Sequence, residues 1–152
     1  MGGRGTSSGS GAGAPASPGR YKAAFERAFP AGSKYSAFVT HYTTEELSHM
    51  TLLLANDGQN GQAIHDHGDG RIEATALFNT DGKGEGIALL NRAIMEDGVN
   101  YLECYAPYLP QAYAKLGFAE TGRYPFDPKQ AAADWNYQDF GTPDYVTMAL
   151  RR

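Results

Sequence analysis

Apolar residues stand at every second position in several stretches of the chain, which is the pattern of half-buried β-strands. The clearest stretch is 71–79, where Ile, Ala, Ala and Phe alternate with Glu, Thr and Leu. With the segment 61–65 it predicts a β-hairpin that turns at the Gly-Asp-Gly of 68–70. Alternating, aromatic and β-branched residues predict further strands over 35–42, 101–106, 118–126 and 145–150.

Apolar residues spaced three or four apart predict helices between these strands. Over 21–29 the aromatic residues share one face, and Pro30 ends the run. Thr43 and Glu46 form a Thr-x-x-Glu capping box, which predicts the start of a helix whose apolar face extends to Leu54. Strands that alternate with helices indicate an α/β fold with a mixed sheet. Two more helices are predicted, one after the glycines of 82–86 and one over 110–116.

The first 20 residues differ in composition from the rest, because nearly all of them are Gly, Ser, Ala, Pro or Thr. Such a segment buries too little apolar surface to offset backbone ordering, which costs about 1–2 kcal/mol per residue. We therefore predict a disordered tail over 1–20 and a single folded domain over 21–152. A domain of that length can bury a substantial core.

Charge and composition exclude several classes of partner. The chain has 13 Lys and Arg against 17 Asp and Glu, a net charge of −4, which argues against nucleic-acid binding and against a polybasic membrane segment. No apolar run approaches the roughly 20 residues of a membrane-spanning helix, and the start lacks the apolar stretch of a signal peptide. The single cysteine, Cys104, excludes an internal disulfide. A cytoplasmic protein is expected.

A glycine-rich segment, Asp81-Gly82-Lys83-Gly84-Glu85-Gly86, stands between a predicted strand and a predicted helix. A turn of this kind lets backbone N–H groups approach a phosphate, and the helix N-terminus adds about half a positive charge. The segment is not a Walker loop, because no Gly-Lys-Ser/Thr follows, and it is a poor dinucleotide fingerprint. Taken alone, the glycines are better explained by a plain tight turn.

The residues around these glycines resemble a known family. The segment 81–90, DGKGEGIALL, is similar to the acyl-CoA loop of the GNAT superfamily of N-acyltransferases, and 112–123, AYAKLGFAETGR, is similar to its Tyr-x-Lys-Leu-Gly-Phe segment. The two stand in the family's order, with one predicted strand between them. The resemblance implies a three-layer fold, in which helices flank a central mixed sheet, somewhat reduced on the N-terminal side.

The resemblance also implies a chemistry. It implies transfer of an acetyl group from acetyl-CoA, as co-substrate, to a primary amine of an unknown acceptor, by a monomer or homodimer. Tyr113 would be the general acid that protonates the departing thiolate, although packing on the sheet explains it equally well. Glu73 or Glu103 would deprotonate the amine through water, although such carboxylates are more often simply exposed. The implied cofactor-binding residues are Leu77, Phe78 and Asn79 near the thioester carbonyl, and Gly82, Lys83, Gly84, Glu85, Gly86 and Ile87 near the pyrophosphate.

Asp81 departs from the family pattern, which has Gln or Arg at that position, and Glu85 adds a second carboxylate. A carboxylate about 4 Å from a phosphate costs about 1 kcal/mol even in a water-like dielectric. An alternative is therefore a non-catalytic GNAT-like accessory or interaction protein. The start MGGRGTSSG and the spacing of motifs from Thr40 to Asp144 resemble small proteins of bacteriophages and prophages, which implies the host cytoplasm as the location.

Three other groups of residues received structural interpretations. His65 and His67 would share one face of a strand and could meet one Zn²⁺, but no Cys and no third His is close in sequence, so we expect a solvated hairpin tip and no metal site. Cys104, between Leu and Ala positions of a predicted strand, is expected to be a small core residue. Aromatic residues near Trp135 are expected to pack over the sheet; the alternative is one wall of an acceptor pocket.

Overall fold

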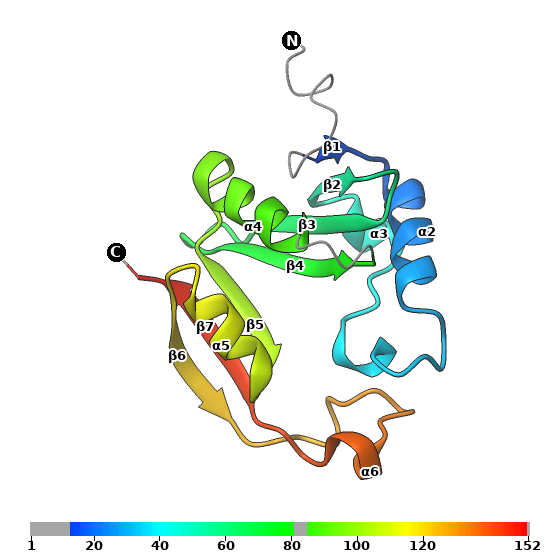
Figure 1. The fold of residues 1–152 in the computed structure, drawn as a ribbon, viewed down its shortest axis with the longest axis vertical. Coiled ribbons are helices and arrows are strands. Elements are labelled where there is room, and N and C mark those ends of the chain that lie inside the picture. Colours follow the sequence, from blue (N-terminus) through cyan, green and yellow to red (C-terminus); the bar gives the residue numbers. More distant parts are fainter. Residues whose placement is uncertain (1–12, 81–84, 152) are drawn as a thin grey trace.

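The computed structural model describes residues 13–80 and 85–151, which form a seven-stranded mixed sheet with helices on both faces (Figure 1). The strand order is β1-β2-β3-β4-β5-β7-β6. Neighbouring strands are antiparallel except β4 and β5, which are parallel. The strands are β1 (Ala14–Pro15), β2 (Thr51–Ala55), β3 (Asn60–Asp66), β4 (Ile72–Asn79), β5 (Tyr101–Tyr105), β6 (Phe118–Tyr124) and β7 (Tyr145–Leu150). This arrangement confirms the predicted α/β fold with a mixed sheet.

Helices cover the two faces of the sheet with two separate cores. Alternate residues of β2 show the division, because Leu52 and Leu54 lie in the core with α2, whereas Leu53 lies in the core with α4. In the part of the chain that the structure describes, no helix is long and apolar enough to cross a membrane. The helical elements are α2 (Pro18–Ala28), the 3₁₀ turn η1 (Ser36–Phe38), α3 (Thr44–Leu47), α4 (Glu85–Glu96), α5 (Tyr108–Ala114) and α6 (Tyr137–Phe140).

Ordered structure begins earlier than the composition predicts. Strand β1 pairs with β2. Ser17 caps α2, because its hydroxyl accepts a hydrogen bond from Arg20 N at 3.2 Å, and Pro18 fits the first turn, where a backbone N–H is not needed. The prediction of a disordered tail is therefore wrong for residues 13–20, and its remainder, 1–12, lies outside the described residues. Helix α2 confirms the helix predicted over 21–29.

The segment 43–55 contains one confirmed prediction and one error. The capping box is present, since Thr43 N donates to Glu46 Oε1 at 2.8 Å and Glu46 N donates to Thr43 Oγ1 at 3.1 Å. The helix nevertheless ends at Leu47, and 51–55 forms β2. The Leu-Leu-Leu-Ala of this strand is buried on both faces, and such a short apolar run has no periodicity that separates a strand from a helix. On the N-terminal side β2 thus supplies a strand where a helix was predicted.

The strand predicted over 35–42 is also wrong, because the structure has the 3₁₀ turn η1 there. The aromatic residues that favoured a strand pack against a distant segment instead. The ring centroids of Phe38 and Phe140 are 4.4 Å apart, and those of Tyr35 and Phe140 are 6.1 Å apart. Tertiary packing has overridden a weak local preference.

Strand β4 contains a β-bulge that the alternating sequence does not reveal. Between the pairs Gly61–Phe78 and Ala63–Thr75, β4 has one residue more than β3, and Ala76 has a φ of 51°. A bulge turns the following side chains to the other face. Ala74 accordingly lies in the core with α4, whereas Ala76 and Phe78 lie in the core with α2. The predicted alternation is therefore wrong beyond Thr75, and the hairpin itself is confirmed.

Candidate active site

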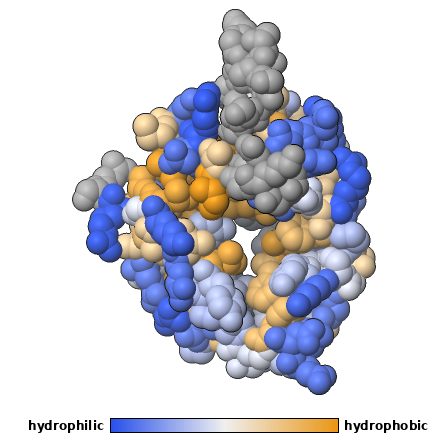
Figure 2. Space-filling model, viewed as in Figure 1, coloured by the Kyte–Doolittle hydropathy of each residue, from blue (hydrophilic) through white to orange (hydrophobic). Residues whose placement is uncertain are grey.

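The sheet opens between its two parallel strands. β4 and β5 are paired only at Glu73 and Tyr101, and from that point the strands diverge (Figure 1). Residues 74–79 of β4 have no partner in β5, so backbone groups on that edge are free of strand pairing. The space-filling view shows an opening near the centre of the molecule (Figure 2). The divergence of β4 and β5 defines the candidate site.

On the face toward α2, the opening is lined by hydroxyl and carboxylate groups. Glu103 of β5 accepts a hydrogen bond from Tyr101 at 2.6 Å through Oε2 and one from Tyr145 at 2.9 Å through Oε1. Burial, followed by the hydrogen bond to Glu103, raises the pKa of Tyr101 to about 12. Burial and the charge of Glu103 also raise the pKa of Tyr145. Both phenols therefore stay protonated near neutral pH and keep both oxygens of Glu103 occupied.

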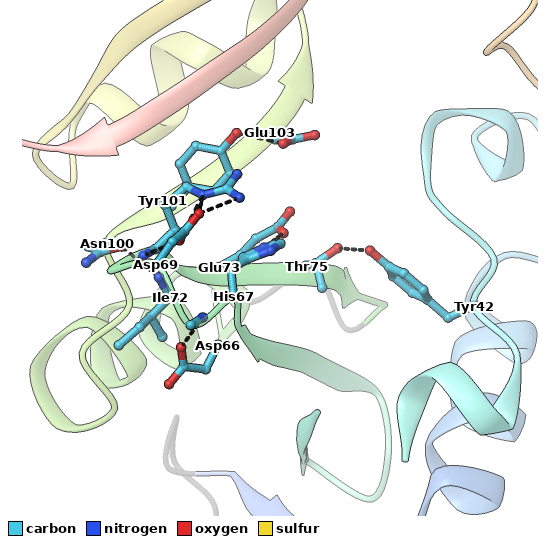
Figure 3. Close-up of polar contacts among 12 residues, drawn as sticks. Tyr42, Asp66, His67, Asp69, Ile72, Glu73, Thr75, Asn100, Tyr101 and Glu103 are labelled. Carbon is cyan, nitrogen blue, oxygen red and sulfur yellow. Dashed lines mark hydrogen bonds and ion pairs between the residues drawn. The ribbon is translucent and has the colours of Figure 1, made fainter. Parts of the chain in front are cut away.

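Glu73 of β4 lies on the same face and is 9% exposed. Its Oε1 is 2.7 Å from Nε2 of His67. Figure 3 draws the two side chains together. Burial raises the pKa of the Glu73 carboxyl, the hydrogen bond from His67 opposes that shift, and the charge of Glu103 adds to it. Thr75, two residues along β4, bonds the Tyr42 hydroxyl at 3.0 Å. Glu73 is therefore a partly desolvated carboxylate at the narrow end of the opening.

On the opposite face, toward α4 and α5, the opening is apolar. Cys104 is 6% exposed in the core with Leu102, which confirms it as a core residue, and burial raises the pKa of its thiol to about 12. Tyr113 of α5 packs against this core, and burial, with a smaller contribution from Cys104, raises the pKa of Tyr113 to about 12. The structure thus places the two predicted catalytic residues, Glu73 and Tyr113, on opposite faces of the sheet.

The predicted cofactor-binding residues are only partly within the described structure. Leu77 packs on the core with α4, whereas Phe78 is buried in the core with α2. Asn79, at the exposed end of β4, meets the first turn of α4: a Cβ on Gly86 would lie 3.0 Å from Asn79 Cβ. Ile87 is 44% exposed. Gly82, Lys83 and Gly84 lie outside the described residues, and Glu85 is the first residue of α4.

An aromatic cluster on the face toward α2 connects η1 with the chain between β6 and β7. Trp135 is 6% exposed, and its Nε1 donates to the Gly141 carbonyl at 2.9 Å. The centroid of its ring lies 5.1 Å from the ring centroids of Phe38 and Tyr105. The predicted packing of Trp135 is confirmed. Sequence reasoning missed Phe38 and Tyr105 in this cluster and Tyr101 and Tyr145 beside Glu103, because their contacts join segments far apart in the chain.

The hairpin tip is more organised than predicted. Glu73 stands close to both His65 and His67, with one ligand atom from each residue within 4.8 Å of the others. The sequence argument considered only ligands close in sequence, whereas the register of β3 and β4 makes His65 and Glu73 direct cross-strand partners.

Similar folds occur among solved acetyltransferases. The ribosomal-protein-S18-alanine N-acetyltransferase from Escherichia coli is 18% identical, with a TM-score of 0.61, and the match covers 90% of each chain. An acetyltransferase from Bacillus subtilis in complex with CoA is 18% identical, with a TM-score of 0.58, over 84% of this chain and 88% of that one. A GNAT family acetyltransferase from Elizabethkingia anophelis with acetyl-CoA bound is 16% identical, with a TM-score of 0.56, over 80% of this chain and 94% of that one.

These likenesses establish the GNAT fold for this chain. No family model matches the sequence, and a search of the curated proteins found no match. Activity must therefore be argued from the site, because one fold can host several functions.

Proposed function

We propose that this chain is an N-acyltransferase that transfers an acetyl group from acetyl-CoA to a primary amine. The observation that carries the proposal is the divergence of β4 and β5, with a buried carboxylate, Glu73, on one face of the sheet and a partly buried phenol, Tyr113, on the other. Two structures of similar fold hold CoA or acetyl-CoA according to their descriptions, which supports the choice of acyl donor.

The residues at the opening fit acetyl-CoA. The edge of β4 from 74 to 79 lacks a strand partner, so it can bond an extended ligand as a strand would. Acetyl-CoA supplies a thioester carbonyl, and backbone N–H groups of Leu77 to Asn79 are the proposed donors to its oxygen. For the pyrophosphate we propose residues 82–87, where α4 begins at Glu85 and its N-terminus favours an anion.

Glu73 is the proposed general base. A carboxyl with a raised pKa is a better proton acceptor than an exposed one, and burial raises that of Glu73. Glu103 is the weaker candidate, because both of its oxygens already accept hydrogen bonds from tyrosines. Glu73 takes a proton from the amine, directly or through one water, on the face toward α2.

Tyr113 is the proposed general acid. It packs, on the face toward α5, against the core that contains Cys104. With a pKa of about 12, its hydroxyl keeps its proton in the free protein. A CoA thiolate that leaves in the same dry surrounding is made more basic by the same loss of solvation, and Tyr113 is the proposed donor of its proton.

The acceptor and the biological setting of the protein stay predictions. The acceptor amine, the choice between monomer and homodimer, the cytoplasmic location and the bacteriophage source have no test in the fold. The start of the chain, which carried part of the resemblance to phage proteins, lies outside the described residues.

Calorimetry with acetyl-CoA tests the proposal, and adenosine 3′,5′-bisphosphate serves as the control for the nucleotide part alone. We expect saturable binding of acetyl-CoA that is tighter than binding of the control, followed by release of free CoA thiol when a panel of primary amines is added. Equal affinity for both ligands would indicate a nucleotide-binding protein in which the opening plays no part. Absence of acetyl-CoA binding would favour the non-catalytic accessory protein.

A further inference from the structure

We propose that His65, His67 and Glu73 form a Zn²⁺ site on the β3–β4 hairpin. Two imidazoles and one carboxylate converge there, with one ligand atom from each residue within 4.8 Å of the others. This is a donor set that Zn²⁺ accepts, and three protein ligands leave a fourth position open for water. The site itself does not depend on the proposed acyltransferase function.

The hairpin holds the three side chains on one face. His65 of β3 and Glu73 of β4 are cross-strand partners, and His67 follows two residues after His65, so that the rings of the two histidines lie 4.2 Å apart. The turn fixes the backbone of His67, because the backbone N–H of His67 donates to the backbone carbonyl of Arg71 at 3.0 Å. The ligands are therefore brought together by the backbone register.

The neighbouring aspartates are used by the turn itself. Asp66 Oδ1 accepts from Gly68 N at 2.9 Å, and Asp69 Oδ1 accepts from Arg71 N at 3.0 Å. Figure 3 labels both aspartates near His67 and Glu73. Asp69 also pairs with the Arg71 guanidinium at 2.9 Å. These contacts stiffen the hairpin tip and engage its two aspartates, whereas His65, His67 and Glu73 remain grouped together.

The distances require little adjustment. In a tetrahedral site with Zn–N and Zn–O distances of about 2.0–2.1 Å, ligand atoms lie about 3.3 Å apart. The His67 Nε2 to Glu73 Oε1 distance of 2.7 Å has to lengthen slightly, and the remaining separations, none above 4.8 Å, have to shorten. Side-chain rotations about χ1 and χ2 accomplish both changes without moving the strands.

The charges around Glu73 favour a cation. Glu73 is 9% exposed, and the charge of Glu103 acts on it. Among the described residues, the ion pairs give Glu73 no Lys or Arg partner, because its only pair is with His67. The nearby Arg71 is engaged by Asp69 and lies 5.1 Å from the centre of the Tyr101 ring. A divalent cation would neutralise a carboxylate that the protein leaves without a permanent counter-charge.

A second histidine–glutamate pair in the chain provides a matched control. His49 and Glu45 of α3 lie 3.2 Å apart with side chains 71% and 84% exposed, and no third ligand is grouped with them among the described residues. His49→Ala removes one of the four histidines without touching the proposed site. It therefore separates binding at the hairpin from weak binding to surface histidines.

The test is titration of the metal-free full chain with Zn²⁺, followed by calorimetry, and with Co²⁺, followed by visible absorption. We expect one Zn²⁺ per chain and Co²⁺ bands typical of tetrahedral coordination. His65→Ala and His67→Ala should each weaken binding by more than the roughly 10–100-fold that loss of an outer-sphere partner costs, while His49→Ala binds as the parent does. Circular dichroism of each variant reports whether it has folded.

Three results would overturn the site. One is the absence of Zn²⁺ binding by the folded parent chain, and another is retention of parent-like affinity in folded His65→Ala and His67→Ala. Loss of binding in His49→Ala would equally show that the metal binds elsewhere. Neither readout uses catalysis, so failure of the site and failure of the proposed function are separate outcomes. Because Glu73 is also the proposed base, bound Zn²⁺ should lower acyl transfer if both proposals hold.

Discussion

The two faces of the sheet at the β4–β5 opening differ in chemistry although the same strands build both. Along β5, Tyr101 and Glu103 point to the polar face toward α2, whereas Leu102 and Cys104 point to the apolar face toward α4 and α5. On the polar face the Glu103 carboxylate accepts hydrogen bonds from two tyrosine hydroxyls, while burial on the apolar face disfavours any charged group.

Under the proposed function, this difference would let one opening serve two substrates. A base is useful only where an amine proton can be accepted and passed on, which requires the polar face. An acid that must keep its proton until a thiolate forms benefits from a dry surrounding, which the apolar face supplies. Strand alternation alone separates the two environments by the thickness of one sheet.

The largest expected effect comes from removing the Glu73 carboxylate from the polar face. Glu73→Gln keeps the shape of the side chain but cannot accept the amine proton, so acyl transfer should fall by about 10³-fold. The affinity for acetyl-CoA, measured by calorimetry, should hardly change. Glu45→Gln on the exposed surface of α3 is the control and should react as the parent does. A parent-like rate in Glu73→Gln would remove this residue from the mechanism.

The corresponding change on the apolar face is Tyr113→Phe, which keeps the ring and its packing but removes the acidic proton. Release of CoA thiol should slow by about 10²-fold, while the free energy of unfolding should change by no more than about 1 kcal/mol. Packing without catalysis gives the reverse pattern, with turnover unchanged. Measuring both quantities on the same preparation decides between the two roles that the sequence left open.

A smaller effect is expected from weakening the support of Glu103. Tyr145→Phe removes the donor that lies 2.9 Å from Glu103 Oε1, and hydrogen bonds to charged groups contribute about 1.5–3 kcal/mol. Urea unfolding should therefore show a loss of roughly that size. Tyr137→Phe, in a residue that is 51% exposed, should change stability by less than about 0.5 kcal/mol. Equal stability of the two variants would mean that water replaces the Tyr145 hydroxyl without cost.

The smallest expected effect is the low reactivity of the Cys104 thiol toward alkylation. With a pKa of about 12, only about 10⁻⁴ of the thiol is ionised near pH 8, and the thiolate is the reactive form. The native chain should resist iodoacetamide, whereas the chain unfolded in urea should be alkylated, as mass spectrometry can show. Rapid labelling of the native chain would contradict the dry character of the apolar face.

Local rules of the sequence determined several parts of this protein. The capping box of Thr43 and Glu46, the glycine turn between β3 and β4, and the alternation in β5 and β7 were all readable, because each depends on residues within one element. The order of the glycine-rich segment and the Tyr113 segment also led to the correct fold. Glu73 and Tyr113 were implied as candidates by the resemblance to the GNAT superfamily, and their roles stay predictions.

The tertiary structure decided how these pieces meet. The strands and helices packed against 51–55 decide whether this segment becomes a strand. Tertiary neighbours likewise decide whether the bulge at Ala76 turns the last side chains of β4 to the other face. Tyr145 reaches Glu103 across 42 positions of the chain, and Glu73 joins His65 through strand register. No local pattern encodes such pairings, because their free energy comes from burial and hydrogen bonds that exist only once distant segments are in contact.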